Sequence, residues 1–427
     1  MVYTGKVTEK AGIFSDRPAA REVEAARWEG FYLVILVIYT AAVFLQVGVF
    51  SNTAGFKSFL QNIRYLCYLG VLIKLIHDYH TRKSMLAIAI LLVIGLLVSV
   101  RSDNRSGLFL FWMIFGASSV DPEKILKVSL IVRSAMLAGI VILSQSGVLK
   151  DTIRDISDRS RHYLGFSWTT YAPTALLFIS LCYFCIRREK TTVAEYAILM
   201  MLAYWLFYMT NSRFIFLLNA GAILLAFLIG LRIRVQRKRK TRQKNSWKKI
   251  FMAIPAVSAA LAIYLQAAYS KYNPFLSKLN TLLTQRLRLG HNALLKYPIT
   301  LFGQPISWIG WENPSAYNYV DSAYLQVLLE QGAILLGAVI ILYSYMIYRA
   351  VKVSDSFLTM SLVIICLLCV TEPRLTETVF NPFILLPFSM CQDWKPGLRE
   401  KGCECSVLTD LRVKSCECSV LTNRSNK

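Results

Sequence analysis

Residues 214–231 have the sequence FIFLLNAGAILLAFLIGL, and residues 232–249 follow directly with RIRVQRKRKTRQKNSWKK. The first stretch has no charged residue and is close to the length of roughly 20 residues that a transmembrane helix needs. The second stretch carries ten basic residues and no acidic residue, and such segments are held on the cytoplasmic side of a membrane. The pair therefore predicts a transmembrane helix that ends at the cytoplasmic face.

The same apolar pattern recurs along the whole chain of 427 residues, of which 55% are hydrophobic and only 17% charged, with a mean hydropathy of +0.47. Soluble domains carry roughly 25% charged residues. The sequence therefore predicts an all-α fold, a polytopic bundle of about twelve transmembrane helices. The predicted spans are 31–50, 59–76, 85–100, 108–120, 129–147, 171–186, 196–211, 214–231, 250–268, 322–348, 356–371 and 380–391.

The last span is interrupted by Pro382 and Pro387, so it is alternatively a re-entrant or interfacial segment. With both termini in the cytoplasm, most of the 48 lysines and arginines fall on the cytoplasmic side, as the positive-inside rule requires. We therefore expect a cytoplasmic N-terminal tail at 1–30, a membrane domain at 31–391 and a cytoplasmic C-terminal tail at 392–427.

This topology leaves two long loops on the exterior, 148–170 and 269–321. The second lies between the ninth and tenth spans and is far longer than most connections. It is rich in aromatic residues, leucine and proline, so we expect it to be ordered, with a short amphipathic helix near Leu279–Leu295 on the membrane surface.

The formal net charge of +23 is read as a topology signal, and we expect no nucleic-acid partner. The basic segment 232–249 either anchors the topology or also contacts anionic lipid. The tail contains a repeat, KGCECSVLTD at 401–410 and KSCECSVLTN at 414–423. Its Cys-X-Cys pairs have closer spacing than usual zinc ligands, so a bland duplicated tail, a zinc site and acylation remain alternatives.

Several arginines fall on the exterior side, against the positive-inside rule. Arginine binds phosphate and pyrophosphate through its planar fork of donors, so these residues are candidates for an anion site, although Arg213 could equally snorkel at the interface. They are Arg154, Arg159, Arg161, Arg213, Arg286, Arg288 and Arg374.

Carboxylates and one histidine on the same side could serve acid–base chemistry. Asp321 and Ser322 are placed to cap the tenth span, and Asp321 can also orient a hydroxyl group. Glu372, in the sequence TEPR at 371–374, is either a helix-end feature or a site residue. His291 is the only histidine of the large loop, and a surface histidine is more often structural than catalytic.

Several short motifs resemble those of the Wzy-type polymerases of the O-antigen polymerase and ligase superfamily. They are RHYLGF at 161–166, NSR at 211–213, YPITLFGQ at 297–304, VDSAYLQVLLEQG at 320–332, TEP at 371–373 and NPF at 381–383. The resemblance covers roughly residues 150–390. Ten residues separate Arg154 from Gly165, as in the family's arginine–glycine spacing, whereas Arg286 and Arg288 fit their interval to Gly303 more loosely.

The resemblance implies a membrane glycosyltransferase that makes O-antigen, capsule or exopolysaccharide. It would join repeat units linked to undecaprenyl pyrophosphate, on the periplasmic or extracellular face of the bacterial cytoplasmic membrane. The implied catalytic residues are Asp321, Arg213, Arg288 and His291. The implied substrate-binding residues are Arg154, Arg161, Gly165, Arg286, Gly303, Tyr324 and Glu372. Arginines would stabilise the leaving pyrophosphate, so we expect neither a metal nor another cofactor.

Two other functions stay open. The family's ligases tend to have a histidine where this chain has Asp321, which favours a polymerase, but His291 could take that role in an O-antigen ligase. A flippase or transporter would also suit twelve spans, although the chain lacks the matching halves of many transporters and contains no Walker A motif. Besides the lipid bilayer, a chain-length regulator and a separate flippase are possible partners.

Overall fold

The computed structural model describes residues 16–49, 54–78, 82–156, 159–239, 246–310 and 314–391. The predicted C-terminal tail with its Cys-X-Cys repeat lies outside these residues, as do residues 1–15 and residues 240–245 of the basic segment.

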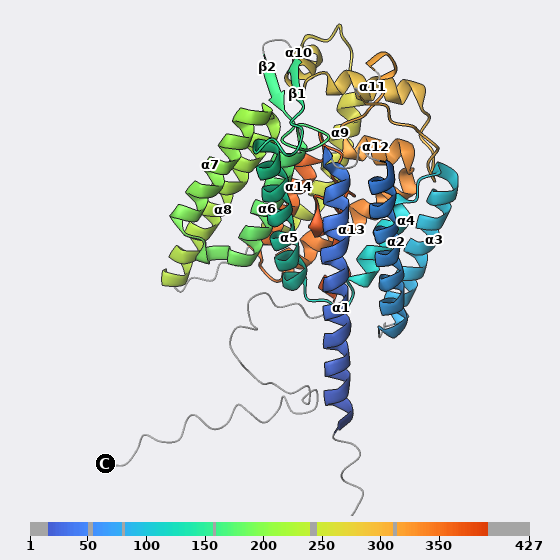
Figure 1. Cartoon of the computed structure of the whole chain (residues 1–427), viewed down its shortest axis with the longest axis vertical. Helices are drawn as coiled ribbons and strands as arrows, with labels where there is room; N and C mark the ends of the chain where they lie inside the picture. Colours follow the sequence, from blue (N-terminus) through green and yellow to red (C-terminus); the bar gives the residue numbers. More distant parts are fainter. Residues whose placement is uncertain are drawn as a thin grey trace, which may run out of the picture. The chain divides into compact units, whose positions relative to one another are not determined.

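Within the described ranges the chain folds into fourteen α-helices and one β-hairpin (Figure 1). The helices before the hairpin are α1 (Asp16–Val47), α2 (Ala54–His77), α3 (Arg82–Ser102), α4 (Ser106–Gly116) and α5 (Pro122–Gln145). The strands are β1 (Ile153–Ile156) and β2 (Arg159–His162). The later helices are α6 (Tyr171–Arg187), α7 (Val193–Thr210), α8 (Arg213–Arg239), α9 (Ile254–Ala267), α10 (Pro274–Leu282), α11 (Arg286–Lys296), α12 (Ala323–Glu330), α13 (Ala333–Lys352) and α14 (Ser356–Leu368).

Short 3-10 helices connect or follow these elements. They are η2 (Arg188–Lys190), η3 (Ser246–Ala253), η4 (Pro314–Ala316), η5 (Pro382–Leu385) and η6 (Ser389–Cys391).

Eight helical segments of the described residues are long and apolar enough to cross a membrane. They are Val23–Val47, Gly55–His77, Ser84–Ser102, Pro122–Gln145, Val193–Thr210, Arg213–Arg237, Ile250–Ala267 and Ala333–Lys352. Each falls on a predicted span. The predicted spans at 108–120, 171–186 and 356–371 are the shorter helices α4, α6 and α14. Length and composition thus indicate a helical membrane protein.

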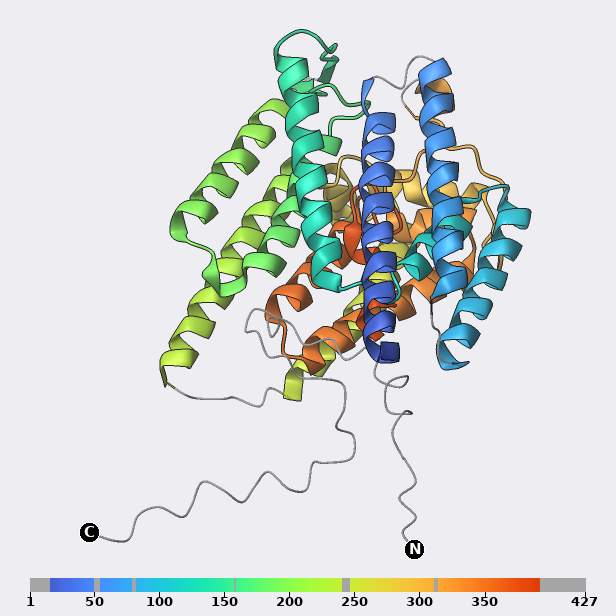
Figure 2. The same ribbon diagram turned by 60° about the horizontal axis from the view of Figure 1, so that its bottom comes forward.

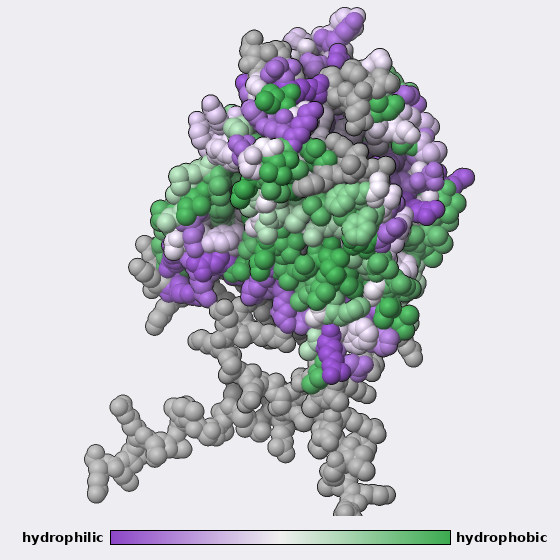
Figure 3. Space-filling model, in the orientation of Figure 1, coloured by the Kyte–Doolittle hydropathy of each residue, from purple (hydrophilic) through white to green (hydrophobic). Residues whose placement is uncertain are grey.

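The outer surfaces of these helices are apolar. Tyr208 of α7, Val100 of α3 and Ile76 of α2 are each more than 70% exposed, which would be costly in water. Figure 3 shows hydrophobic residues across the middle of one face, with hydrophilic residues toward both ends. A belt of this kind suits the hydrocarbon core of a bilayer.

The core of the bundle is formed by α6, α14 and the segment that follows α14. Helix α6 packs against α5 and α8, and α14 packs against α8 and α13, while α7 lies beside α8 (Figure 2). Residues 380–390 are buried, and residues 382–385 and 389–391 form the 3-10 helices η5 and η6. They do not form the α-helix that a twelfth crossing would need. Irregular backbone is tolerated inside a membrane protein where other parts of the protein surround it.

Polar side chains hold that irregular segment in place. Asn381 donates a hydrogen bond of 2.6 Å to Tyr343 Oη and bonds of 3.1 Å to the carbonyl oxygens of Arg374 and Leu375. Arg133 of α5 is fully buried and donates to the carbonyl oxygens of Val379 and Thr378 at 3.0 and 2.5 Å. These hydrogen bonds give partners to backbone carbonyl groups that are not paired within an α-helix.

The predicted span at 322–348 is broken. Helix α12 ends at Glu330 and α13 begins at Ala333, because Gly332 has φ +90° and its Cα lies against the backbone of Leu301 and Gly303. A Cβ on Gly332 would lie 2.4 Å from the nitrogen of Gly303. The backbone at Leu301 and Gly303, in the loop that precedes α12, therefore packs directly against the break between α12 and α13.

The hairpin is the departure from an all-α fold. Asp151 fixes its base, because its carboxylate accepts from the backbone nitrogens of Tyr163 and Leu164 at 3.0 and 2.8 Å and pairs with His162 Nδ1 at 2.6 Å. The hairpin, α10 and α11 lie at one end of the helices (Figure 1). The last turns of α8 lie at the other end, where Arg234 donates to the carbonyl oxygen of Glu189 at 2.6 and 2.9 Å.

Candidate functional site

The hairpin brings two predicted site residues together. Arg154 of β1 and Arg161 of β2 are direct cross-strand partners, so both side chains leave the same face of the hairpin. Arg161 Nε donates to the carbonyl oxygen of Thr210 at 2.9 Å, and its Nη2 donates to Ser212 Oγ at 3.4 Å. The hairpin is thereby fastened to the turn between α7 and α8.

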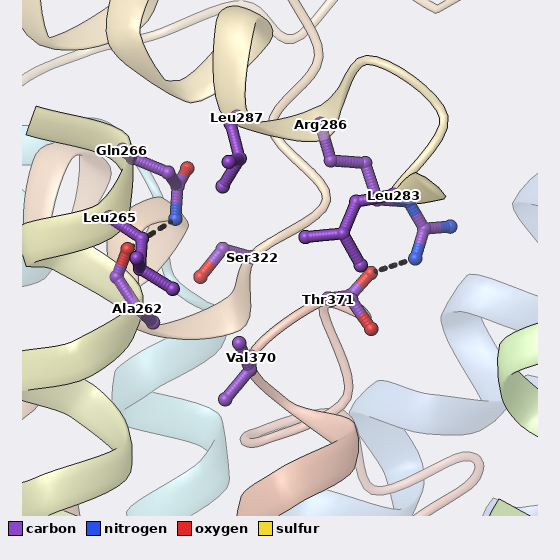
Figure 4. Close-up of a pocket in the computed structure, with 9 residues that line it drawn as sticks. All are labelled: Ala262, Leu265, Gln266, Leu283, Arg286, Leu287, Ser322, Val370 and Thr371. Atoms are coloured by element: carbon purple, nitrogen blue, oxygen red, sulfur yellow. Dashed lines mark hydrogen bonds between the residues drawn. The ribbon is translucent and has the colours of Figure 1, made fainter. Parts of the chain in front are cut away.

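Arg286, the first residue of α11, links two carboxylates. Its Nη1 donates to the carbonyl oxygen of Thr371 at 2.6 Å (Figure 4), and its Nη2 donates to Glu372 Oε1 at 2.8 Å. Its Nε lies 3.3 Å from Asp321 Oδ2. One guanidinium thus connects the start of α11 with Asp321, two residues before α12, and with the segment after α14.

The turn between α10 and α11 places Arg286 at this point. The predicted amphipathic helix near Leu279–Leu295 is divided there into two helices, because Thr284 and Gln285 adopt positive φ values of 54° and 68°. Buried Asn280 holds the turn: it donates to Gln285 Oε1 at 2.8 Å and accepts from the Arg288 backbone nitrogen at 3.0 Å.

Glu372 is buried and has partners on three sides. Besides Arg286, it accepts from Thr170 Oγ1 at 3.3 Å and lies 3.9 Å from Arg374 Nη2. Arg374 in turn pairs with Glu377, and its guanidinium lies 4.7 Å from the ring centres of both Tyr171 and Phe380. Such stacking against aromatic faces holds a buried guanidinium in a fixed orientation.

Burial and neighbouring charges act on these groups in opposite directions. Burial alone would lower the pKa of Arg286, but the carboxylates of Asp321 and Glu372 raise the pKa above its ordinary value. Burial raises the pKa of Asp321, although Arg286 opposes this. The pKa of Arg161 is lowered by burial and by the charge of Arg286. Arg286 therefore stays charged, whereas Asp321 ionises less readily than an exposed aspartate.

Five predicted site residues thus form one group, which we call the arginine–carboxylate cluster: Arg154, Arg161, Arg286, Asp321 and Glu372. It contains three guanidinium groups and two carboxylates. Guanidinium groups of this kind bind phosphate oxygens, and a partly buried carboxylate such as Asp321 can accept a proton or a hydrogen bond from a hydroxyl group.

Three further predicted residues lie near the cluster without joining it. Arg213 follows Ser212, the partner of Arg161, but its own side chain is exposed. Arg288 lies two residues after Arg286 in the first turn of α11 and is also exposed. His291 lies with its Nδ1 3.1 Å from the carbonyl oxygen of Gln266. Their catalytic roles stay predictions.

The other predicted residues have close structural contacts. Gly165 has φ +79°, and a Cβ there would lie 3.0–3.1 Å from Ile140 and Ser144. Gly303 has φ +85°, and a Cβ there would lie 2.2 Å from the carbonyl oxygen of Glu330. Tyr324 is 1% exposed and donates to the carbonyl oxygen of Cys366 at 3.0 Å. At each of these three positions, the close contacts account for the type of residue that the sequence has there.

Two residues near the cluster were not predicted: Thr170, which donates to Glu372, and Glu377, which pairs with Arg374 beside Glu372. Both adjoin quoted motifs, since Thr170 follows RHYLGF closely and Glu377 lies between TEP and NPF. Spacing along the chain gave no reason to select either. No group of three or more histidine, cysteine, aspartate or glutamate side chains in the described ranges could hold a metal ion, and metal independence stays a prediction.

Comparisons with protein-family models, with curated proteins and with solved structures found no match for this chain. The site is therefore interpreted from its own geometry and from the motifs of the sequence.

Proposed function

We propose that this protein is a polysaccharide polymerase that joins repeat units carried on undecaprenyl pyrophosphate. The observation that carries the proposal is the arginine–carboxylate cluster itself. Residues far apart in the chain, from the hairpin, the start of α11, the start of α12 and the end of α14, meet in it. Guanidinium groups can bind a pyrophosphate, and a carboxylate can orient a sugar hydroxyl group.

The position of the cluster supports an exterior site. The cluster lies at the end of the bundle that holds the hairpin, α10 and α11 (Figure 1). The C-terminal turns of α8, which lead into the basic segment 232–249, lie at the opposite end. The positive-inside rule assigns that segment to the cytoplasm. The proposed active face is therefore the periplasmic or extracellular face of the bacterial cytoplasmic membrane.

In the proposed reaction, an acceptor hydroxyl oxygen attacks the anomeric carbon of a growing chain. The bond from that carbon to the pyrophosphate oxygen breaks, and undecaprenyl pyrophosphate leaves with the electron pair. Asp321 accepts the hydroxyl proton, which restores a neutral glycosidic oxygen. Arg154, Arg161 and Arg286 stabilise the charge that develops on the pyrophosphate, and Arg213 binds it where it meets the membrane surface.

Glu372 has a positioning role in this scheme. It accepts from Arg286 at 2.8 Å and from Thr170 at 3.3 Å, which orients the guanidinium without contact to the substrate. A positively charged group that is fixed before the reaction stabilises a developing charge more effectively than a mobile one. Arg374, which is buried and pairs with the partly exposed Glu377, lies 3.9 Å from Glu372 and supports its position.

Deletion of the gene tests the function. Surface polysaccharide and lipid-linked glycans would be extracted and sized on gels and by mass spectrometry. A polymerase predicts single repeat units without long chains. Normal long chains that are not attached to their final acceptor would instead indicate a ligase, and repeat units trapped on the cytoplasmic face would indicate a flippase.

Labelling of introduced cysteines tests the sidedness. Tyr272 is 83% exposed in the large loop, and Arg237 near the end of α8 is largely exposed as well. In a background whose tail cysteines are serine, Tyr272→Cys should react with a membrane-impermeant maleimide in intact cells. Arg237→Cys should react only after permeabilisation, and the reverse pattern would refute an exterior site.

A further inference from the structure

Asn318, three residues before Asp321 in the large loop, forms hydrogen bonds through its backbone nitrogen and through both polar atoms of its side chain. Its backbone nitrogen donates to the carbonyl oxygen of Ile309 at 3.2 Å, and its Oδ1 accepts from the backbone nitrogen of Ile309 at 2.6 Å. Its Nδ2 donates to the carbonyl oxygen of Ser307 at 3.0 Å and to Tyr297 Oη at 3.1 Å. These bonds fasten the chain just before Asp321.

Trp308 lies between Ser307 and Ile309 and is bound to the far end of α12. Its Nε1 donates to Glu330 Oε2 at 2.8 Å. Glu330 is the last residue of α12 and is 9% exposed, and its other carboxylate oxygen accepts from Asn104 Nδ2 at 2.5 Å. An indole N–H is a donor only, so this bond holds the indole ring in one orientation. Trp308 therefore joins the large loop to the end of α12.

Asp321 lies between these two attachment points. Asn318 precedes it, and α12 begins two residues after it, at Ala323. A helix moves largely as one rigid element, so the bond at Glu330 also limits the movement of the start of α12. Residues Ser307–Ile309, which we call the loop brace, therefore hold the chain on both sides of Asp321.

The ring of Trp308 adds packing to these hydrogen bonds. Its centre lies 6.1 Å from that of Tyr297 and 6.4 Å from that of Tyr319, and both pairs meet edge to face. Edge-to-face contacts between aromatic rings are favourable. Because Tyr319 is two residues before Asp321, the loop brace also packs against the segment that leads into the carboxylate.

The side chain of Asp321 has a single ion pair in the described part of the chain. Its Oδ2 lies 3.3 Å from Arg286 Nε, whereas charge-assisted hydrogen bonds between such groups are typically about 2.7–2.9 Å long. The side chain is also 16% exposed. A close partner therefore does not fix this carboxylate, and its position depends on the backbone that carries it.

We propose that the loop brace positions Asp321 for the reaction, with Asn318 and Trp308 as positioning residues that do not touch the substrate. The inference rests on the proposed function, in which Asp321 accepts the proton of the acceptor hydroxyl group. A displacement of a catalytic group by about 1 Å can lower a rate by roughly 10²-fold. Substrate binding should be less sensitive, because Arg161 and Arg286 are held by other partners.

Two substitutions loosen the loop brace from different sides. Asn318→Ala removes the bonds of the side chain, and Trp308→Phe removes the indole N–H but keeps an aromatic ring. In reconstituted polymerisation each should lower kcat about tenfold or more and leave KM within about twofold. Asn292→Ala, at an exposed asparagine of α11, and Trp205→Phe, on the outer face of α7, are the matched controls. Unchanged kcat in Asn318→Ala or in Trp308→Phe overturns the proposal.

The Asp321→Asn background separates positioning from a general structural role. A residue that acts only through Asp321 has no further effect once that carboxylate is gone. Asn318→Ala should therefore leave the residual rate of Asp321→Asn unchanged. A second tenfold loss in the double variant would show that Asn318 supports the fold in general, and it would overturn the proposal.

Hydrogen–deuterium exchange tests the loop brace without reference to the reaction. In full-length protein in lipid nanodiscs, Asn318→Ala should speed exchange about tenfold or more in peptides that cover residues 318–325, and it should leave peptides from α7 unchanged. Unchanged exchange at 318–325 overturns the proposal even if polymer is made. If the unmodified protein makes no polymer, the proposed function fails, whereas faster exchange in the variant still shows that the loop brace holds Asp321.

Discussion

Arg154 and Arg161 lie directly opposite each other in the β1–β2 hairpin. Like charges at directly opposed positions destabilise a strand pair, and Arg161 is also close enough to Arg286 for that charge to lower its pKa. The protein thus gathers positive charge at a cost in folding free energy. A bound anion would offset this cost, which is the physical reason for assigning the hairpin to substrate binding.

Arg154→Gln tests whether the charge of Arg154 lowers the stability of the fold and favours substrate binding. Removing one of two opposed charges should increase the free energy of unfolding by roughly 0.2–1 kcal/mol and should raise KM for the lipid-linked repeat unit. Thermal unfolding and initial-rate measurements on purified protein check both effects. Lys150→Gln removes an exposed charge just before the hairpin and should change neither. A loss of stability in Arg154→Gln would contradict the account.

Arg286→Lys tests the geometry of the guanidinium separately from its charge. Arg286 contacts Thr371, Glu372 and Asp321 through three different nitrogen atoms. The single ammonium of lysine cannot reproduce that planar fork, so kcat should fall by about 10²-fold. Arg105→Lys, at an exposed arginine before α4, is the control. Full activity in Arg286→Lys would show that charge alone is sufficient.

The pH dependence follows from the partly buried carboxylate of Asp321. Its folded-state pKa lies above the unfolded value, so ionised Asp321 opposes folding. That cost is absent below the unfolded pKa of ~3.9 and complete above the folded pKa. The proposed reaction needs the ionised form, so activity should fall on acidification at a higher pH than an exposed aspartate would give.

Glu372→Gln should move this acid limb of the pH–rate profile. The negative charge of Glu372 helps to raise the pKa of Asp321, so its removal should shift the limb to lower pH, along with a loss of kcat. Glu123→Gln alters an exposed pair with Lys127 and should leave the limb in place. If the acid limb of the pH–rate profile does not move in Glu372→Gln, the group that titrates in that profile is not Asp321.

Gly332→Ala tests the break between α12 and α13. Alanine at φ +90° is strained, and its Cβ would lie 2.4 Å from the backbone of Gly303 and Leu301. We expect the free energy of unfolding to fall by about 2–4 kcal/mol. Gly139→Ala on α5 has no atom within 4 Å of the added Cβ and should stabilise the protein by roughly 0.5–1 kcal/mol. Equal melting temperatures for the two variants would contradict this account of the break.

Long apolar segments were predictable because lipid imposes one simple rule, that apolar side chains run for about 20 residues. The predicted spans 196–211 and 214–231 follow it and coincide with most of α7 and α8. The rule fails where protein replaces lipid. Residues 380–391 are as apolar as a span, but they contain only short 3-10 helices, and residues 380–390 are buried in protein. Local sequence does not distinguish a protein environment from a lipid environment.

The cluster was predictable in part. Arg154, Arg161, Arg286, Asp321 and Glu372 were selected because charged residues on the exterior of an apolar bundle invite a functional reason. The sequence could not distinguish Arg286 from Arg288, because the choice depends on the turn at Gln285 that orients the first residue of α11. The hairpin was not foreseen either, since its strands have only four residues each.

Reconstituted polymerisation tests the central claim most directly. Full-length protein in liposomes would receive lipid-linked single repeat units, without nucleotide, and the products would be sized by gel. Within the time that the unmodified protein and Arg105→Lys need to make chains of many repeat units, we predict almost entirely single units with Asp321→Asn or Arg286→Lys. Long chains from Asp321→Asn and Arg286→Lys, or none from the unmodified protein, would contradict the assignment of the arginine–carboxylate cluster as the site of glycosyl transfer.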